Sequence, residues 1–305
     1  MYFLLLATAL GADPHLSHTR LVTANGHGVA VFNADDSSKA VLNHFSDHLY
    51  QQYDASSVPT WNLLFDTYFG LSAEGSCGWL TSEAGYGYLE GSNVLWVDRT
   101  RGNLKITEYI WSPMELAHPA FAHLLHIENT GSSTIDNVRV SSLHNYHIGD
   151  DNQGTNNDNE NISWSDGLVE QGTNTGFVIN VHPLVDADSY GCDSVYDKVN
   201  SCEVLDSTCN SSGTDMVGGM QWMLGDIPTG GDGWVGVVQG FSSAGDTTTV
   251  PALATTWQAA RQPAELLNAE LDWWANWLDK GTLATGALSA DEQLVYNQAL
   301  VFLKM

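Results

Sequence analysis

Carboxylates are the most numerous side chains in this sequence that could act as acids, bases or cation ligands. There are 36 Asp and Glu residues against 10 Lys and Arg. Hydrolysis of a glycosidic bond, for example, needs two carboxyl groups roughly 5 to 10 Å apart, flanking the bond that breaks. Candidates in the first half of the chain are Glu83, Glu90, Glu108, Glu115 and Glu128. Acidic residues are so common here that their positions single out no pair.

Oxygen-bearing side chains are densest in the segment GDDNQGTNNDNENI, residues 149–162. Carboxylate and amide oxygens at this density suit Ca²⁺, and the candidate ligands are Asp150, Asp151, Asn152, Asp158 and Glu160. The segment does not match the EF-hand pattern. Ca²⁺ is therefore predicted as an optional ligand, with a solvated acidic loop as the alternative. The sequence has no phosphate-binding loop, dinucleotide fingerprint or nucleophilic serine motif, so it calls for no other cofactor.

Three of the four cysteines, Cys192, Cys202 and Cys209, lie in an Asp- and Ser-rich stretch, residues 191–215. Their spacing does not fit common zinc patterns, which use closely paired cysteines. One disulfide is expected here, joining Cys202 to either Cys192 or Cys209. Unpaired surface thiols and a metal site are the alternatives. Cys77 stands apart from this stretch and carries no recognisable nucleophile motif.

Four histidines occur as two pairs, each with a spacing of three residues: His123 with His126, and His144 with His147. Both pairs fall in predicted strands, where an offset of three places side chains on opposite faces. A shared metal ion is therefore disfavoured. Structural or sugar-facing histidines are the better interpretation.

The formal net charge of −26 limits the classes of partner. Phosphate backbones and anionic lipid surfaces are bound through clustered Lys and Arg, which this sequence lacks. Nucleic acid and membrane partners are therefore not expected. A neutral partner such as an α-glucan or another oligosaccharide is compatible with the charge.

The first 16 residues, MYFLLLATALGADPHL, contain an apolar run that is too short to span a bilayer. Two interpretations stay open. The run is a secretory signal that lacks the usual basic start, or it is a buried first strand. The first interpretation implies a secreted or periplasmic protein.

Residues 17–258 are predicted to form one large antiparallel β-sandwich. Strands and turns follow one another at close spacing, and no long helical pattern interrupts them. Asn25-Gly26 is a hairpin turn signal. In the segment 93–113, the apolar residues Leu104, Ile106 and Ile110 alternate with polar ones after a turn at 101–103, which predicts a second hairpin.

The composition changes in residues 259–284, where a linker helix is predicted from Ala264 to Lys280. Pro263 suits the first turn of a helix, and Gly281 suits a C-cap. One face of this helix is apolar and is formed by Leu267, Leu271, Trp274 and Leu278, with Trp273 and Trp277 beside it.

Residues 285–305 are predicted to begin a second helix. Ser289 and Glu292 have the spacing of a capping box. Helical periodicity places Val295, Ala299 and Phe302 on one stripe, alongside Tyr296, Leu300 and Leu303. The sequence therefore predicts an apolar helix face that needs a packing partner.

Four strings together resemble bacterial proteins of glycoside hydrolase family 15, of the glucoamylase and glucodextranase type. They are NGHGVAVFN, SSLHNYHIG, AELDWWANWLDKG and SADEQLVYNQALVFLKM. The resemblance implies a galactose mutarotase-like β-supersandwich, a linker helix and the first helix of a truncated (α/α)6 catalytic barrel. Families 65 and 94, which include disaccharide phosphorylases, share this architecture.

In family 15 the general acid and general base are glutamates in barrel loops well beyond the first barrel helix. The resemblance therefore implies that no residue of these 305 is catalytic. The resemblance implies the non-catalytic N-terminal portion of an inverting α-glucan hydrolase, whose partner is its own missing catalytic domain. A carbohydrate-binding module, a disaccharide phosphorylase and a mutarotase-like epimerase using a His and a Glu of the sandwich are the alternatives.

Overall fold

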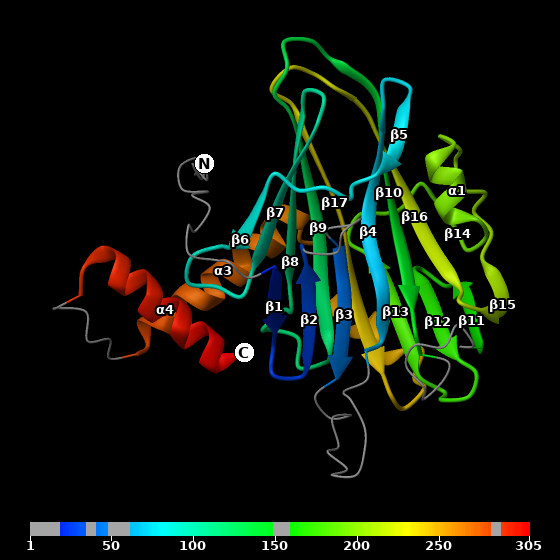
Figure 1. The fold of residues 1–305 in the computed structure, drawn as a ribbon. Coiled ribbons are helices and arrows are strands. Elements are labelled where there is room, and N and C mark those ends of the chain that lie inside the picture. The colour runs from blue at the N-terminus through cyan, green and yellow to red at the C-terminus, as the bar shows by residue number, and fades with distance from the viewer. Residues whose placement is uncertain (1–18, 35–40, 48–61, 149–158, 282–287) are drawn as a thin grey trace.

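The structure is a computed structural model that describes residues 19–34, 41–47, 62–148, 159–281 and 288–305. The described strands form two antiparallel sheets that face each other (Figure 1). The eight-stranded sheet, called sheet A, has the order β1 (Arg20–Ala24), β2 (Gly28–Asn33), β3 (Val41–Asp47), β4 (Leu64–Ala73), β10 (Ile135–Tyr146), β16 (Val217–Ile227) and β14 (Ser189–Gly191), with β5 (Ser76–Trp79) paired to β4.

The nine-stranded sheet, called sheet B, carries most of the remaining chain. Its order is β15 (Asn210–Thr214), β11 (Asn159–Trp164), β12 (Leu168–Gly172), β13 (Val178–Pro183), β17 (Asp232–Ser242), β9 (Ala120–Asn129), β8 (Leu104–Trp111), β7 (Leu95–Arg101) and β6 (Gly85–Tyr88). The prediction of a mainly β, antiparallel sandwich is therefore confirmed.

The hairpin predicted in segment 93–113 is the pair β7–β8. Arg101 pairs with Leu104, and Gly102 takes a positive φ of 59° in the turn, a backbone conformation that glycine adopts without steric cost. Leu104, Ile106 and Ile110 point into the space between the sheets and are fully buried. The alternation of apolar and polar residues therefore correctly predicted which face of β8 is buried between the sheets.

Sheet B is buried on both faces in its central part. Its inner face contributes to the main core between the sheets, and its outer face packs against helices through a second apolar cluster that includes Trp111, Leu124 and Val238. Because both faces of the sheet are covered here, the C-terminal end of β8 is apolar on both faces. Tyr109 and Trp111 are buried on the outer face, and Ile110 is buried on the inner face.

Four described helices complete the fold: α1 (Val195–Asn200), α2 (Thr249–Gln258), α3 (Pro263–Asp279) and α4 (Ala290–Lys304). Helices α3 and α4 lie where the sequence predicted them, with α3 beginning and ending one residue earlier than expected, and α4 begins with the expected capping box at Ser289 and Glu292. Helix α2 was not predicted, because its threonines and its internal Pro251 are weak helix formers. It lies on β13 and β17 and contributes Ala254 and Trp257 to the second cluster.

Both expected disulfide pairings are wrong. The structure joins Cys77 to Cys202 and Cys192 to Cys209, with Cα–Cα distances of 5.4 and 5.1 Å. Strand β5 carries Cys77 and packs against α1, whose C-terminal end leads directly into Cys202. This proximity arises from the tertiary fold, and the sequence spacing of the three clustered cysteines could not reveal it.

Candidate functional site

The linker helix α3 is fixed to the sandwich by a buried tryptophan. Trp274 is fully buried, and its indole Nε1 donates to two acceptors, Asn93 Oδ1 and Glu270 Oε1, each at 2.9 Å. Both acceptors are buried as well. The indole N–H of Trp274 thus links α3 to the loop that carries Asn93. Because the donor and both acceptors are buried, this bond restricts rotation of α3 about its own axis.

Asn93 extends this contact into both sheets. Its side-chain amide donates to the carbonyl oxygen of Ala24 in β1 at 3.2 Å and to that of Ser112, just after β8, at 2.8 Å. Strand β1 belongs to sheet A and β8 to sheet B. The helix, one buried asparagine and both sheets therefore form one hydrogen-bonded unit, which we call the linker anchor (Asn93, Glu270, Trp274).

Glu270 adds a second link, because its Oε2 accepts from the backbone N–H of Met114 at 3.2 Å. The loop that carries Met114 is also held by Asn25, whose Nδ2 reaches the carbonyl oxygens of Pro113, Leu116 and His118. Burial raises the pKa of Glu270 to about 8, even though the N–H donors of Met114 and Trp274 act in the opposite direction. The carboxyl group is therefore mainly protonated near neutral pH.

We expect this titration to make the protein less stable as the pH rises. A carboxyl group whose pKa is about 4.3 when unfolded and about 8 when folded stabilises the fold fully below the lower value, and this stabilisation is lost as the pH rises through the upper one. Between about pH 5 and about pH 7 the loss should be about 2 to 3 kcal/mol. Urea unfolding of the wild type and of Glu270→Gln across this range isolates the effect.

The Glu270→Gln variant should be less stable at pH 5, since its NH₂ group faces one of the two N–H donors. Its stability should nevertheless change less with pH than that of the wild type. All other titrating groups are shared by the two proteins. Parallel pH curves would therefore contradict a titrating Glu270.

The start of α3 is held by charge and by capping. Gln262 and Glu265 form a capping box, and Pro263 occupies the first helical turn. Arg261, at the junction with α2, forms an ion pair with Glu115 at 3.3 Å and lies over the Trp257 ring, 5.9 Å from its centre. The α2–α3 corner is thereby tied to the loop between β8 and β9.

Helix α4 is attached more lightly. Val301 is fully buried, Gln298 Nε2 donates to the carbonyl oxygen of Ser92 at 3.1 Å, and Phe302 meets the Tyr88 ring edge-on at 5.2 Å. Tyr88 ends β6, and Ser92 lies in the loop between β6 and β7, directly before Asn93. Helix α4 therefore sits beside the linker anchor.

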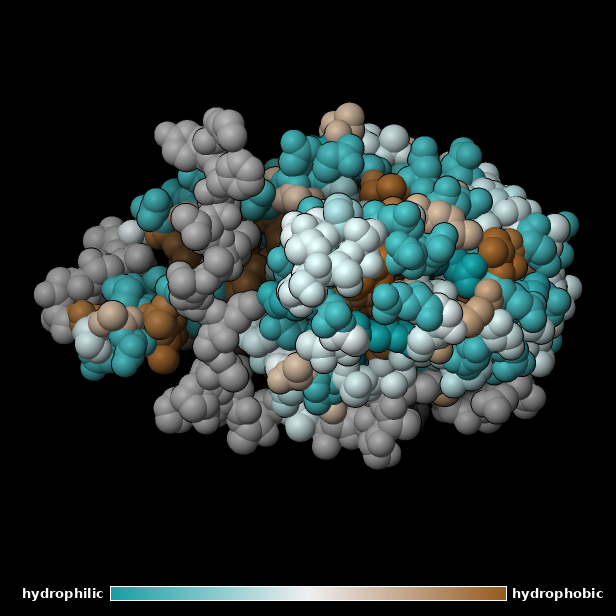
Figure 2. Space-filling model, turned by 90° about the horizontal axis from the view of Figure 1, so that it is seen from above, coloured by the Kyte–Doolittle hydropathy of each residue, from teal (hydrophilic) through white to brown (hydrophobic). Residues whose placement is uncertain are grey.

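The predicted apolar stripe of α4 is largely uncovered, although Phe302 at its C-terminal end also contacts Tyr88. Its members Val295, Ala299 and Phe302 are exposed, with side chains 72% exposed for Val295 and 46% for Phe302. The neighbouring Leu294 and Leu303 are exposed too. Figure 2 shows hydrophobic surface on the helix at the edge of the molecule. We call these five residues the α4 stripe.

A separate group of charged side chains lies inside the sandwich. Glu108 on β8 accepts from Arg99 Nε on β7 at 2.6 Å and lies 2.9 Å from His123 Nε2 on β9. Burial alone would raise the pKa of Glu108, but the adjacent Arg99 and His123 lower it overall, so the carboxylate is charged. All three side chains are at most 2% exposed. A His and a Glu do meet here, but no substrate can reach them, so we assign this network a structural role.

The other histidines are dispersed. His144 is buried between the hydroxyl groups of Thr67 and Ser142, and burial lowers its pKa to about 3, so it is neutral. His126 stacks on Trp234 with ring centres 4.0 Å apart and contacts Asp232. His147 stacks on Phe65. As expected, members of each pair point to different environments.

The remaining candidate carboxylates do not form a site. Glu83, Glu90, Glu115 and Glu128 lie on separate loops and strands, and in the described residues no group of three or more His, Cys, Asp or Glu could hold a metal ion. Of the proposed Ca²⁺ ligands, Asp150, Asp151, Asn152 and Asp158 lie outside the described residues. Glu160 is buried and accepts from the backbone N–H groups of Ile148 and Met216. The Ca²⁺ site stays a prediction, to be checked by the effect of Ca²⁺ on the melting temperature.

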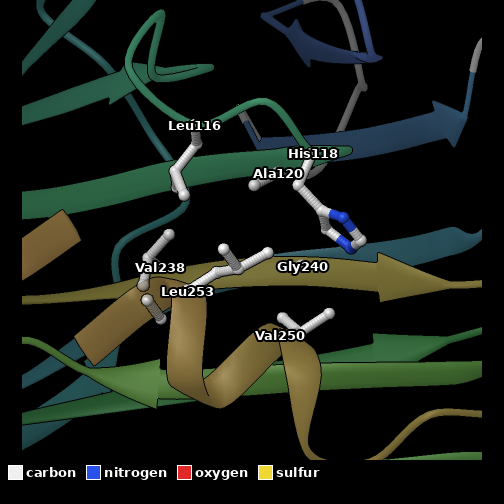
Figure 3. A pocket seen from close by; sticks show the side chains of 8 residues that line it. Leu116, His118, Ala120, Val238, Gly240, Val250 and Leu253 are labelled. Carbon is white, nitrogen blue, oxygen red and sulfur yellow. The ribbon is translucent and has the colours of Figure 1, made fainter. Parts of the chain in front are cut away.

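Figure 3 shows a small apolar hollow between α2 and strands β9 and β17. Side chains of Val250 and Leu253 on α2 face Leu116 and Val238 across it. Its volume is about 10 Å³, close to the least space that holds one water molecule. It is a packing gap and cannot admit a sugar.

No protein-family model matches this chain, and no curated protein sequence does. Among solved structures, a bacterial glucoamylase complexed with acarbose is similar with a TM-score of 0.61 and 11% sequence identity. The match covers 93% of this chain and 40% of the glucoamylase chain. At this identity the likeness shows a shared fold: the chain has a glucoamylase-like fold and spans 40% of that enzyme's length.

A galactose mutarotase related enzyme from Lactobacillus acidophilus is similar with a TM-score of 0.44 and 9% identity, over 74% of this chain and 98% of that chain. At this TM-score the second likeness supports no inference. No helix in the described ranges is long and apolar enough to cross a membrane.

Sequence reasoning found the two helices of this region but missed the linker anchor. Trp274 was placed in the apolar stripe of α3, whereas Asn93 gave no signal and Glu270 was not singled out. The one available clue was Glu270 itself, which lies four residues before Trp274 and so on the same face of an apolar helix.

Proposed function

We propose that this chain is the non-catalytic N-terminal portion of an inverting α-glucan hydrolase of the glucoamylase and glucodextranase kind, in family 15. The chemistry then belongs to a helical domain outside these 305 residues. The observation that carries the proposal is the α4 stripe, an exposed apolar helix face held beside the linker anchor of a glucoamylase-like sandwich.

The expected occupant of the α4 stripe is a helix of that catalytic domain. Large apolar residues in a row seldom stay in water on a monomeric protein, and they usually mark a packing surface. The stripe residues recur at helical spacing, as they do where one helix packs on another. In this arrangement the sandwich fixes the first helix of the barrel, and the partner of the whole protein is an α-glucan or oligosaccharide.

Glucose release from maltose and dextran tests the proposal. We expect the 305-residue chain to release none, and we expect the longer gene product, including whatever follows Met305, to release glucose with inversion at the anomeric carbon. Glucose release by the purified 305-residue chain would place the chemistry in the sandwich and refute the proposal. A longer product without hydrolytic activity would refute it as well.

A substitution pair tests the α4 stripe directly. Val295→Ser combined with Leu303→Ser should reduce binding of a hydrophobic dye and self-association of the chain, while stability changes by about 0.5 kcal/mol or less, because both side chains are exposed. Val301→Ser is the matched control. Since Val301 is the buried contact of α4, this change should release the helix and increase dye binding.

Dye fluorescence and sedimentation velocity give the two readouts. If the double variant binds as much dye as the wild type, the stripe is not the apolar surface that the structure indicates.

We also propose that the protein works in the periplasm or outside the cell. Two disulfides support this, because such bonds persist mainly in oxidising compartments. Mass determination of the protein isolated from its native compartment, with and without reduction before alkylation, tests it; free thiols in that sample would contradict it.

A further inference from the structure

A second hollow lies on the outer face of sheet A, away from α3 and α4. Its volume is about 720 Å³, and its lining comes from β4, the β4–β5 turn, β10, β16 and Cys202. Figure 1 shows the β4–β5 hairpin and α1 at the same end of sheet A. The hollow, which we call the sheet-A pocket, is large enough for a short ligand.

Neighbouring strands build the floor of the pocket. Arg139 on β10 lies opposite Ser72 on β4 and Met223 on β16, so the three side chains stand in one row. Just before Arg139, β10 shifts its register against β16, and Asn137 takes a positive φ of 53°. This bulge interrupts the regular surface of the sheet and leaves room beside the row.

The walls are fixed in place. On one side stands the β4–β5 turn with Glu74 and Gly75. Cys202, which also lines the pocket, is held by its disulfide to Cys77 of β5, and its carbonyl oxygen accepts from Arg139 Nη2 at 2.9 Å. A covalent bond and a hydrogen bond from Arg139 thus fix Cys202 relative to β5 and β10.

Arg139 has donor capacity that the described protein does not use. Its side chain is nine-tenths buried, and in the part of the chain that the structure describes its Nε–H has no hydrogen-bond acceptor. A buried guanidinium N–H without an acceptor is costly. The enclosed Nε–H is not itself open to a ligand, but Arg139 is one of the residues that line the pocket, so a ligand there can contact its guanidinium group.

The charged residues that line the pocket indicate which class of ligand it can bind. The pocket contains the carboxylates of Glu74 and Asp136, both exposed, against the single cation Arg139. Two carboxylates repel an anion, whereas Arg139 repels a metal ion. A neutral ligand with hydroxyl groups satisfies both, because its oxygens accept from the guanidinium and its O–H groups donate to the carboxylates. The exposed side chain of Met223 offers an apolar surface for C–H groups.

We propose that the sheet-A pocket binds a short neutral oligosaccharide. Arg139 donates to its hydroxyl oxygens, Glu74 and Asp136 accept from its hydroxyl groups, and Met223 packs against a sugar ring. This inference rests on the pocket itself and not on the proposed hydrolysis. Binding is therefore expected from the 305-residue chain even though that chain is expected to release no glucose.

Saturation-transfer NMR with maltotriose and with isomaltotriose as probes tests the proposal, followed by titration to obtain Kd. The key variant combines Glu74→Gln and Asp136→Asn, two exposed positions whose change should leave the fold intact. Loss of charge-assisted hydrogen bonds should weaken binding about tenfold or more. Asp272→Asn on α3 removes one exposed carboxylate far from the pocket and is the matched control.

Arg139→Lys is a second probe, since it keeps the positive charge but replaces the planar guanidinium group by a single ammonium group, and it should also weaken binding. Circular dichroism verifies that each variant is folded. Saturation transfer to neither trisaccharide would overturn the proposal, as would equal affinity in the wild type and the Glu74→Gln/Asp136→Asn variant. Binding of inorganic phosphate or Ca²⁺ in place of both sugars would overturn it too.

Discussion

Removing the Cys77–Cys202 disulfide by the double change to alanine is expected to lower the free energy of unfolding by about 5 kcal/mol. The two cysteines are 125 residues apart in sequence, so the bond closes a very long loop in the unfolded chain. In the chain-entropy description, the stabilisation grows with the length of the closed loop. Urea unfolding at equilibrium measures the change.

The second disulfide is the internal comparison. Cys192 and Cys209 are 17 residues apart, so their replacement by alanine should cost only about 3 kcal/mol by the same reasoning. An equal or reversed order of the two effects would show that local strain or residual structure in the unfolded chain outweighs loop length.

The Glu108→Gln variant should lose about 3 to 5 kcal/mol, because it removes the carboxylate charge that the buried Arg99 guanidinium contacts. The relevant contacts are the 2.6 Å pair with Arg99 and the 2.9 Å contact with His123. Water cannot replace either contact at this depth. Thermal and urea unfolding at neutral pH provide the measurement.

Glu128→Gln is the matched control for this prediction. Glu128 pairs with Lys105 at 3.4 Å, but both side chains are 38% exposed, so its loss should cost about 1 kcal/mol or less. A double change of Arg99 to Met and Glu108 to Leu should cost less than Glu108→Gln alone, since it removes both buried charges together. If the double variant is the least stable, the network contributes more than its separate charges.

Elements with strong local signals could be predicted from the sequence. The β7–β8 hairpin shows alternation around a glycine turn, and α4 begins with a capping box. Each signal lies within a few residues of the element it defines. Helix α2 lacked such a signal, because its sequence favours a helix only when packed against β13 and β17.

The linker anchor and the disulfides are formed by contacts between segments that are distant in sequence. This is why sequence reasoning missed the anchor and predicted the wrong disulfide pairing. Asn93 and Trp274 are 181 residues apart, and nothing near either residue indicates the other. Cys77 was set aside because it lies far from the cysteine-rich stretch, yet the fold brings β5 against α1. Glu270 was overlooked because an acidic residue on a helix ordinarily faces solvent, and only the tertiary packing buries it.

The shared indole hydrogen bond at Trp274 restricts how any following domain can move. Rotating α3 on the sandwich would expose the Glu270 carboxyl and leave the Asn93 side chain without its donor in a dry environment. The contact between the sandwich and helix α3 is therefore expected to be rigid and not to act as a hinge. If a further domain follows α3, its motion relative to the sandwich therefore has to arise after this contact.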